Sequence, residues 1–216
     1  MKNTFQIFAV AAILICLSSG HAVAQRTVKP NAKGQGRPQI KNAQVEVYKT
    51  VGEVELRAWI FKPKSFNESQ KLPAAIFFFG GGWRNGNPQQ FVEHCKYLRS
   101  RGMIGIVVDY RVSARHPVKV IDCIADAKSA IRWARLNSER LGIDPERIAA
   151  GGGSAGGHLA AATATVAGFD SPEDQTVVSC RPNALLLFNP AVVLAGISGK
   201  TEIDEKRLAS MRERAG

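Results

Sequence analysis

Two glycine-rich runs, each directly behind a short apolar run, constrain most strongly how this chain can fold. Four of the 20 glycines lie in residues 80–86 and five in residues 151–157. The runs before them, residues 74–79 and 147–151, have the length and composition of buried strands. Because ligands of an open parallel sheet bind beyond the carboxyl ends of its strands, both glycine runs are predicted to face a binding site.

The remaining strand signals predict an α/β fold with a doubly wound, mostly parallel sheet. The segments on either side of Gly52 and Glu53, residues 45–51 and 55–61, alternate in polarity as the strands of a hairpin do. After them the strands are fully apolar, as expected of central strands covered on both faces. They are predicted at residues 74–79, 105–109, 147–151 and 184–189.

Two helices are predicted between these strands, at residues 88–101 and 118–137. The first carries Phe91, Cys95 and Leu98 at helical spacing. The second has an apolar face of Val120, Ile121, Ile124, Ala127, Ile131 and Ala134. Strands that alternate with helices indicate a doubly wound sheet, here with an antiparallel start.

The N-terminal residues are predicted to stand apart from the fold. Residues 1–24 combine a basic start, an apolar stretch and a small-residue end, which is the pattern of a secretory signal peptide. We therefore expect a secreted or periplasmic protein without stable membrane insertion, although an uncleaved anchor stays open. Residues 25–41 are predicted to be a flexible basic tail, and residues 42–216 the folded domain.

The charge and the cysteines exclude several function classes. The net charge of +11 is concentrated toward the front of the chain, and no zinc-finger or helix-turn-helix pattern accompanies it, so no nucleic-acid partner is expected. Removing the signal peptide would leave Cys95, Cys123 and Cys180, which have neither Cys-x-x-Cys nor zinc-ligand spacing. No metal and no cofactor are predicted.

The second glycine run carries the most specific motif. Gly152-Gly153-Ser154-Ala155-Gly156 fits G-x-S-x-G between a predicted strand and a predicted helix, the context of a nucleophile elbow. Such a turn strains the serine backbone and tolerates only small neighbours, while the start of the helix points free amides at the reacting carbonyl. Ser154 is therefore predicted to be a catalytic nucleophile.

A dinucleotide site is the rival interpretation of the same run. Gly151, Gly153 and Gly156 also spell G-x-G-x-x-G in a strand-to-helix turn. That fingerprint normally opens the first strand–helix–strand unit and is followed about 20 residues later by an acid at a strand end. Here it comes late, and Glu173 and Asp174 lie in a polar loop that contains proline, so the sequence favours the nucleophile.

Four segments together resemble the α/β-hydrolase fold. The backbone amides of the first glycine run, Gly80 to Gly82, could face a substrate oxygen as an oxyanion hole requires. That run lies in FFFGGGW, and the others are VVDYRV, HPVKVIDCIADAKSAIRW and RIAAGGGSAGGHLAAATA. Over about residues 45–195 the chain is similar to hormone-sensitive-lipase-like carboxylesterases and their bacterial esterase and lipase relatives.

The resemblance implies a role for several residues. Ser154 would be the nucleophile, and the amides of Gly81, Gly82 and Ala155 would form the oxyanion hole. The relatives usually carry a histidine where this chain has Phe79, which bears on how the loop is supported. Asp109, Tyr110 and Arg111 match a structural motif of the family. Asp122 and Asp126 are expected to be solvated acids or acids that pin a loop.

The acid and the base of a catalytic triad are missing from the pattern. In this fold the acid and the histidine follow the serine, yet His158 alone follows Ser154 and is expected to pack in the core or against a helix. His94 and His116 precede the serine. Residues 184–189 would be the sixth of eight strands, so the domain is expected to lack its last strands through C-terminal truncation.

The functional prediction is a secreted serine ester hydrolase that forms an acyl-serine intermediate. Its substrates would be small acyl esters or carbohydrate-linked esters, and the chain could be inactive without the acid and base. Two alternatives stay open. One is a non-catalytic, hydrolase-like binding protein, and the other is a dinucleotide-binding enzyme.

Overall fold

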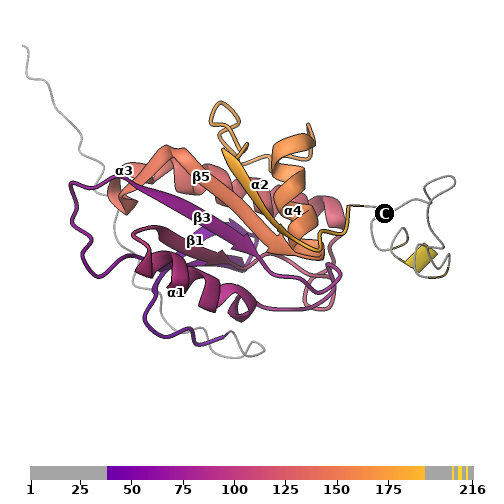
Figure 1. The fold of residues 1–216 in the computed structure, drawn as a ribbon. Helices are drawn as coiled ribbons and strands as arrows, with labels where there is room; N and C mark the ends of the chain where they lie inside the picture. Colours follow the sequence, from indigo (N-terminus) through magenta and orange to yellow (C-terminus); the bar gives the residue numbers. More distant parts are fainter. Residues whose placement is uncertain (1–37, 193–205, 207–208, 211–212, 214–216) are drawn as a thin grey trace, which may run out of the picture. The chain divides into compact units, whose positions relative to one another are not determined.

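The computed structural model describes residues 38–192 and, near the C terminus, residues 206, 209–210 and 213. The predicted signal peptide and most of the predicted basic tail lie outside the described residues. The described part is built around a six-stranded sheet (Figure 1). Its order is β1-β2-β4-β3-β5-β6, and the predicted α/β fold with a mostly parallel sheet is confirmed.

The hairpin at the start of the sheet forms as predicted. β1 (Gln44–Val51) and β2 (Val54–Phe61) are antiparallel, with Val51 opposite Val54 across a two-residue turn. Gly52 in that turn has a φ of +55°, which suits glycine. β2 then pairs antiparallel with β4, which joins the hairpin to the parallel part.

The parallel part holds four strands. They are β3 (Leu72–Phe78), β4 (Ile104–Val108), β5 (Ile143–Gly153) and β6 (Ala184–Phe188). β3 pairs with β4 on one side and β5 on the other, and β5 also pairs with β6. Each predicted strand is found, and β5 begins four residues earlier than its apolar run indicated.

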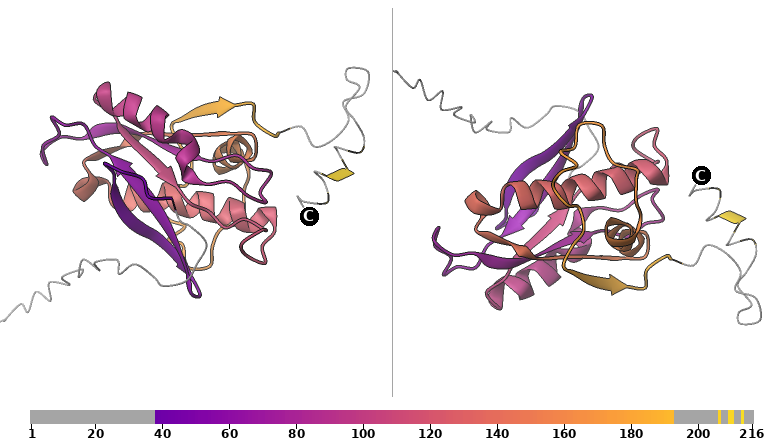
Figure 2. Two further views of the ribbon diagram at one scale, coloured as in Figure 1. Left: turned by 90° about the horizontal axis from the view of Figure 1, so that it is seen from below. Right: turned by 90° about the horizontal axis from the view of Figure 1, so that it is seen from above.

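Helices cover the sheet on two faces, as Figure 2 shows. The chain after β3 forms a 3₁₀ turn (Pro88–Phe91) that leads into α1 (Val92–Ser100). The opposite face carries α2 (Val120–Leu136) and α4 (Ala155–Thr165), and α3 (Ser138–Leu141) precedes β5. Among the described residues, no helix is long and apolar enough to cross a membrane.

Because successive side chains of a strand point to opposite faces of the sheet, the central strands contribute to two separate hydrophobic cores. In β3, Ala75 and Phe77 pack in the cluster of buried residues that includes Val92 and Cys95 of α1. The alternate residues Ala74, Ile76 and Phe78 pack in the cluster that includes the buried side chains of α2 and α4. The central strands are therefore covered on both faces, as their apolar sequence predicts.

Two predictions of burial are wrong. β6 was expected to be a covered central strand, yet all five of its residues are exposed, Leu185 by 37% and Phe188 by 43%. The reason is positional, because β6 lies at the edge of the described sheet and pairs with β5 alone. Ile121 is 41% exposed, since it follows Val120 by one residue and so points about 100° away from the stripe that α2 buries.

Candidate active site

Ser154 stands at a sharp turn between β5 and α4. Its backbone has φ +51° and ψ −116°, outside the regions that ordinary residues favour. Its side chain is exposed, whereas Ala155, the first residue of α4, is fully buried. The strained turn predicted for a nucleophile elbow is confirmed. At this turn Ser154 is exposed although its neighbours in α4 are buried.

The close packing of α4 on the strands explains why only small residues fit beside Ser154. A Cβ added to Gly156 would lie 2.1 Å from the Phe78 carbonyl oxygen and 2.5 Å from that of Phe79. A Cβ on Gly152 would lie 2.5 Å from the same Phe78 oxygen. The start of α4 therefore lies directly against the end of β3 as well as that of β5.

The first glycine run lies against the second. A Cβ added to Gly80 would meet the Gly153 carbonyl oxygen at 2.7 Å, so the two runs are in backbone contact. Gly80 donates its N–H to Gln90 Oε1 over 2.5 Å. Gly81 has φ +142°, and its carbonyl accepts hydrogen bonds from the N–H groups of Arg84 and Asn85, both over 3.1 Å. The loop thus folds back on itself beside the serine.

Three amides at this junction have no protein partner. Within residues 38–192, the N–H groups of Gly81, Gly82 and Ala155 donate to no protein acceptor. The Ala155 amide is also at the N-terminus of α4, where the helix dipole favours negative charge. Such amides can stabilise the oxyanion of a tetrahedral intermediate. Their role as an oxyanion hole stays a prediction.

Phe79, the position at which the relatives usually carry histidine, supports the loop by stacking. Its ring lies on that of Tyr110, with centroids 4.1 Å apart and planes 18° from parallel. The Tyr110 hydroxyl donates to the Phe79 carbonyl over 2.8 Å. Burial above all, then the charges of Cys123 and Asp109, raises the pKa of Tyr110 well above its usual value, so the phenol stays a donor.

The acidic residues behind the site are structural. Asp126 is fully buried and accepts hydrogen bonds from Arg111 Nε and Nη2 over 2.8 and 2.9 Å, and Lys49 Nζ lies 2.8 Å from its Oδ1. Asp122 accepts the Lys119 N–H at the start of α2. Asp109 pairs with Arg115. The prediction that Asp126 pins a loop is therefore confirmed, and its solvation is excluded.

No histidine side chain that the structure describes is hydrogen-bonded to the Ser154 hydroxyl. His158 packs edge-on against Trp83, with ring centroids 5.2 Å apart and planes at 87°, which confirms its predicted packing role. Burial lowers its pKa, and its Nδ1 is buried without a partner among the described residues. His94 lies among the rings of Phe77, Phe91 and Phe188.

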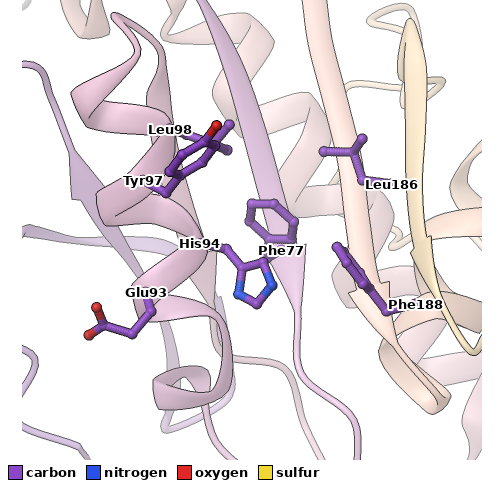
Figure 3. A pocket seen from close by; sticks show the side chains of 7 residues that line it. All are labelled: Phe77, Glu93, His94, Tyr97, Leu98, Leu186 and Phe188. Atoms are coloured by element: carbon purple, nitrogen blue, oxygen red, sulfur yellow. The ribbon is translucent and has the colours of Figure 1, made fainter.

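A cavity of about 350 Å³ lies on the α1 face of the sheet (Figure 3). Phe188 of β6 and His94 of α1 face each other across it. Its lining is mostly apolar and consists of Phe77, Glu93, His94, Tyr97, Leu98, Leu186 and Phe188. None of the predicted site residues lines it, although Phe188, which does, accepts the Ser154 N–H through its carbonyl.

Two of the three glycines of the dinucleotide fingerprint, Gly151 and Gly156, lie in tight packing contacts. Gly156 is confined by the carbonyls of Phe78 and Phe79, and a Cβ on Gly151 would lie 2.7 Å from the Phe77 ring. The next parallel strand along the chain, β6, is followed by Asn189, where the fingerprint requires an acid. Within the described residues, no group of three metal-ligating side chains could hold a metal ion.

Sequence reasoning missed one part of this site. The segment after β6 reaches the serine backbone: Ser154 donates its N–H to the Phe188 carbonyl, and Ala191 donates its N–H to the Ser154 carbonyl, both over 3.0 Å. The signal that could have found it is Asn189-Pro190, a turn directly behind an apolar run.

Solved structures that are similar to this chain include those of a bacterial esterase. The apo form of Thermogutta terrifontis esterase 2 is 47% identical to this chain with a TM-score of 0.75, over 83% of this chain and 64% of that one. The same enzyme phosphonylated by sarin gives 46% identity and a TM-score of 0.77, over 83% of this chain and 65% of that one.

Curated relatives are also named as esterases, but they match shorter parts of this chain. Carboxylesterase NlhH of Mycobacterium tuberculosis is 37% identical over 100 residues, which are 44% of this chain and 30% of the relative. Esterase LipC of that organism is 38% identical over 94 residues, or 43% and 23% of the two chains. This chain thus spans under a third of these two relatives and just under two thirds of the esterase 2 structures.

A family model settles the membership. The model described as BD-FAE matches residues 60–207, more than half of the chain, and its match includes both glycine runs and Ser154. With the sheet order, the strained serine turn and the esterase neighbours, the chain belongs to the BD-FAE family, within the α/β-hydrolase esterases.

Proposed function

We propose that this protein is a serine ester hydrolase in which Ser154 is the nucleophile. The observation that carries the proposal is the exposed, strained serine at the start of α4, next to the unpaired amides of Gly81, Gly82 and Ala155. An ester carbonyl above the serine would have its carbon near Oγ and its oxygen near these amides.

The proposed reaction has two steps. Ser154 Oγ attacks the carbonyl carbon and loses its proton to a general base, and the amides stabilise the negative charge that develops on the carbonyl oxygen. The tetrahedral intermediate collapses to an acyl-serine, and the alcohol leaves with a proton. Water then attacks the acyl-serine, which releases the carboxylic acid and restores the serine.

Within residues 38–192, no side chain that could act as the general base is hydrogen-bonded to the Ser154 hydroxyl. Neither His94, His116 nor His158 donates to or accepts from the Ser154 hydroxyl. Serine and oxyanion hole without the base retain only weak chemistry, so we expect slow turnover of this chain. The same observation favours the second candidate, a non-catalytic binding protein with the architecture of a hydrolase.

Short acyl esters are the substrates we propose. The related Thermogutta terrifontis esterase 2 has been solved with propionate and with butyrate bound. Carbohydrate-linked esters with a short acyl group would present the same carbonyl to Ser154 and remain part of the proposal. We also propose secretion through residues 1–24, which fractionation of the source cells and N-terminal sequencing of the exported protein would check.

A fluorophosphonate probe tests the reaction directly. The probe phosphonylates a nucleophilic serine with loss of fluoride, so the wild-type chain should gain the probe's mass on the peptide that contains Ser154. Ser154→Ala should abolish labelling, whereas Ser100→Ala, a substitution in α1, should leave it intact. Hydrolysis of p-nitrophenyl butyrate should follow the same pattern.

The test also separates the candidates. Reversible binding of butyrate without any probe labelling would favour the non-catalytic binding protein and contradict the nucleophile. Labelling that survives Ser154→Ala would place the reactive group elsewhere.

A further inference from the structure

The backbone of Ser154 is held by the chain on both sides of the turn. On the α4 side, His158 donates its N–H to the Ser154 carbonyl over 3.0 Å, as the first bond of a helix does. On the β6 side, the Ser154 N–H donates to Phe188, and the Ser154 carbonyl accepts a second bond from the Ala191 N–H. Both polar groups of this strained residue are therefore bonded.

The residues after β6 reach the serine where the chain bends at Asn189. Its φ is +45°, a left-handed conformation that asparagine tolerates better than most residues. Pro190 then lies against α4, where a Cβ added to Gly157 would be 3.0 Å from Pro190 Cα. The next residue, Ala191, points its N–H at the Ser154 carbonyl.

A residue in a sparsely populated conformation keeps it only where its surroundings over-determine it. The helix bond from His158 and the strand bond to Phe188 are of the ordinary kind for residues at such boundaries. The bond from Ala191 is additional, and it comes from a segment that is itself strained at Asn189.

We propose that Asn189, Pro190 and Ala191 form a backbone clasp that holds Ser154 in its reactive conformation, with the Ala191 N–H as the positioning group. The clasp acts through the backbone of the serine and touches no substrate. Its effect on reactivity rests on the proposed function, whereas its effect on the conformation of Ser154 does not.

Removing one hydrogen-bond donor tests the clasp. Ala191→Pro deletes the N–H that bonds Ser154. Val192→Pro is the matched control, because the Val192 N–H donates only to the Pro190 carbonyl inside the segment. In the full chain, amide exchange followed by mass spectrometry should become about tenfold faster over residues 152–158 in Ala191→Pro, the size expected for one lost hydrogen bond, and stay unchanged in Val192→Pro.

Reactivity provides the second readout. Under saturating fluorophosphonate, Ala191→Pro should label Ser154 about tenfold more slowly, while the probe concentration at half-maximal rate stays that of wild type. A general loss of folding would alter both quantities and the circular dichroism spectrum. If the wild-type chain is not labelled at all, the proposed hydrolase fails, and the exchange measurement still decides the clasp.

A second pair of variants covers the case in which Ala191→Pro does not fold. Asn189→Val places a β-branched residue at a positive φ and should loosen residues 152–158 in the same way. Asn189→Gly fits that φ without strain and should keep the wild-type exchange and labelling. Unchanged exchange in Ala191→Pro or in Asn189→Val, or equal effects of Ala191→Pro and Val192→Pro, would overturn the clasp.

Discussion

β3 and β6 flank β5 on its two sides, and both are short parallel strands of apolar residues. Residues 74–78 of β3 are all buried, whereas residues 184–188 of β6 are all exposed. The difference lies in their neighbours. β3 has a strand on each side, α1 on one face and α2 with α4 on the other, while β6 pairs only with β5 in the described sheet. An apolar strand sequence therefore shows what a strand can bury, and the tertiary arrangement decides whether it does.

The largest effect is expected at Gly156, where α4 packs tightly against the end of β3. Gly156→Ala would force a Cβ to within 2.1 Å of the Phe78 carbonyl oxygen at the end of β3. Because the obstacle is backbone, α4 has to move, and we expect the free energy of unfolding in urea to fall by more than about 4 kcal/mol.

Gly102→Ala is the control for that variant. Gly102 has a φ of +79°, a backbone strain that Gly156 in α4 lacks, and nothing lies within 4 Å of a Cβ added to it. Its loss should be about 1 to 2 kcal/mol, from backbone strain alone. Equal losses in the two variants would mean that the contact of α4 with β3 at Gly156 costs no more than backbone strain at an open turn.

An effect of intermediate size should distinguish β3 from β6 directly. Ile76→Ala in β3 removes a fully buried side chain and should cost about 2 to 5 kcal/mol of unfolding free energy. Leu187→Ala in β6 removes a side chain that is 39% exposed and should cost less than about 1 kcal/mol. Urea denaturation of both variants measures the difference. Similar losses would show that β6 is covered in solution as β3 is.

The smallest effect is expected from the titration of His158 in α4. Burial lowers the pKa of His158, which packs against Trp83, so the unfolded chain takes up a proton there before the folded chain does. Stability should therefore fall as the pH drops below about 6.5, the ordinary histidine value, toward the lower folded pKa. Above pH 6.5 His158 should contribute no pH dependence.

His158→Asn should flatten this part of the dependence, which melting temperatures between pH 5 and pH 7.5 would measure. Ser154→Ala, changed one helical turn away, is the control and should keep the wild-type slope. An unaltered slope in His158→Asn would assign the acid sensitivity to other groups.

Much of the fold and the turn at Ser154 could be predicted from the sequence. The run of small residues around Ser154 predicted a strained turn, because a side chain at Gly152 or Gly156 has no room between strand and helix. The alternation of apolar runs and helical faces predicted each strand and the helices α1 and α2, since both periods are local properties of the chain. The roles of Ser154, Gly81, Gly82 and Ala155 in catalysis remain predictions.

The errors and omissions share a cause. Ile121 was counted with the apolar face of α2 because its spacing fits loosely, and only the packing of that helix shows that it faces away. The stacking of Phe79 on Tyr110 and the bond from Ala191 to Ser154 join residues more than 30 positions apart. The periodicity of a short segment does not indicate which distant residues will come into contact.

The sequence by itself determined where the strands lie, where the nucleophile turn is and which small residues it needs, because these follow from backbone sterics and from side-chain periods within a few residues. Only the tertiary structure decided that the two glycine runs touch, that β6 is exposed and that the chain behind β6 holds the serine. Each of these depends on which distant segments become neighbours, and burial and hydrogen bonding are properties of those neighbours.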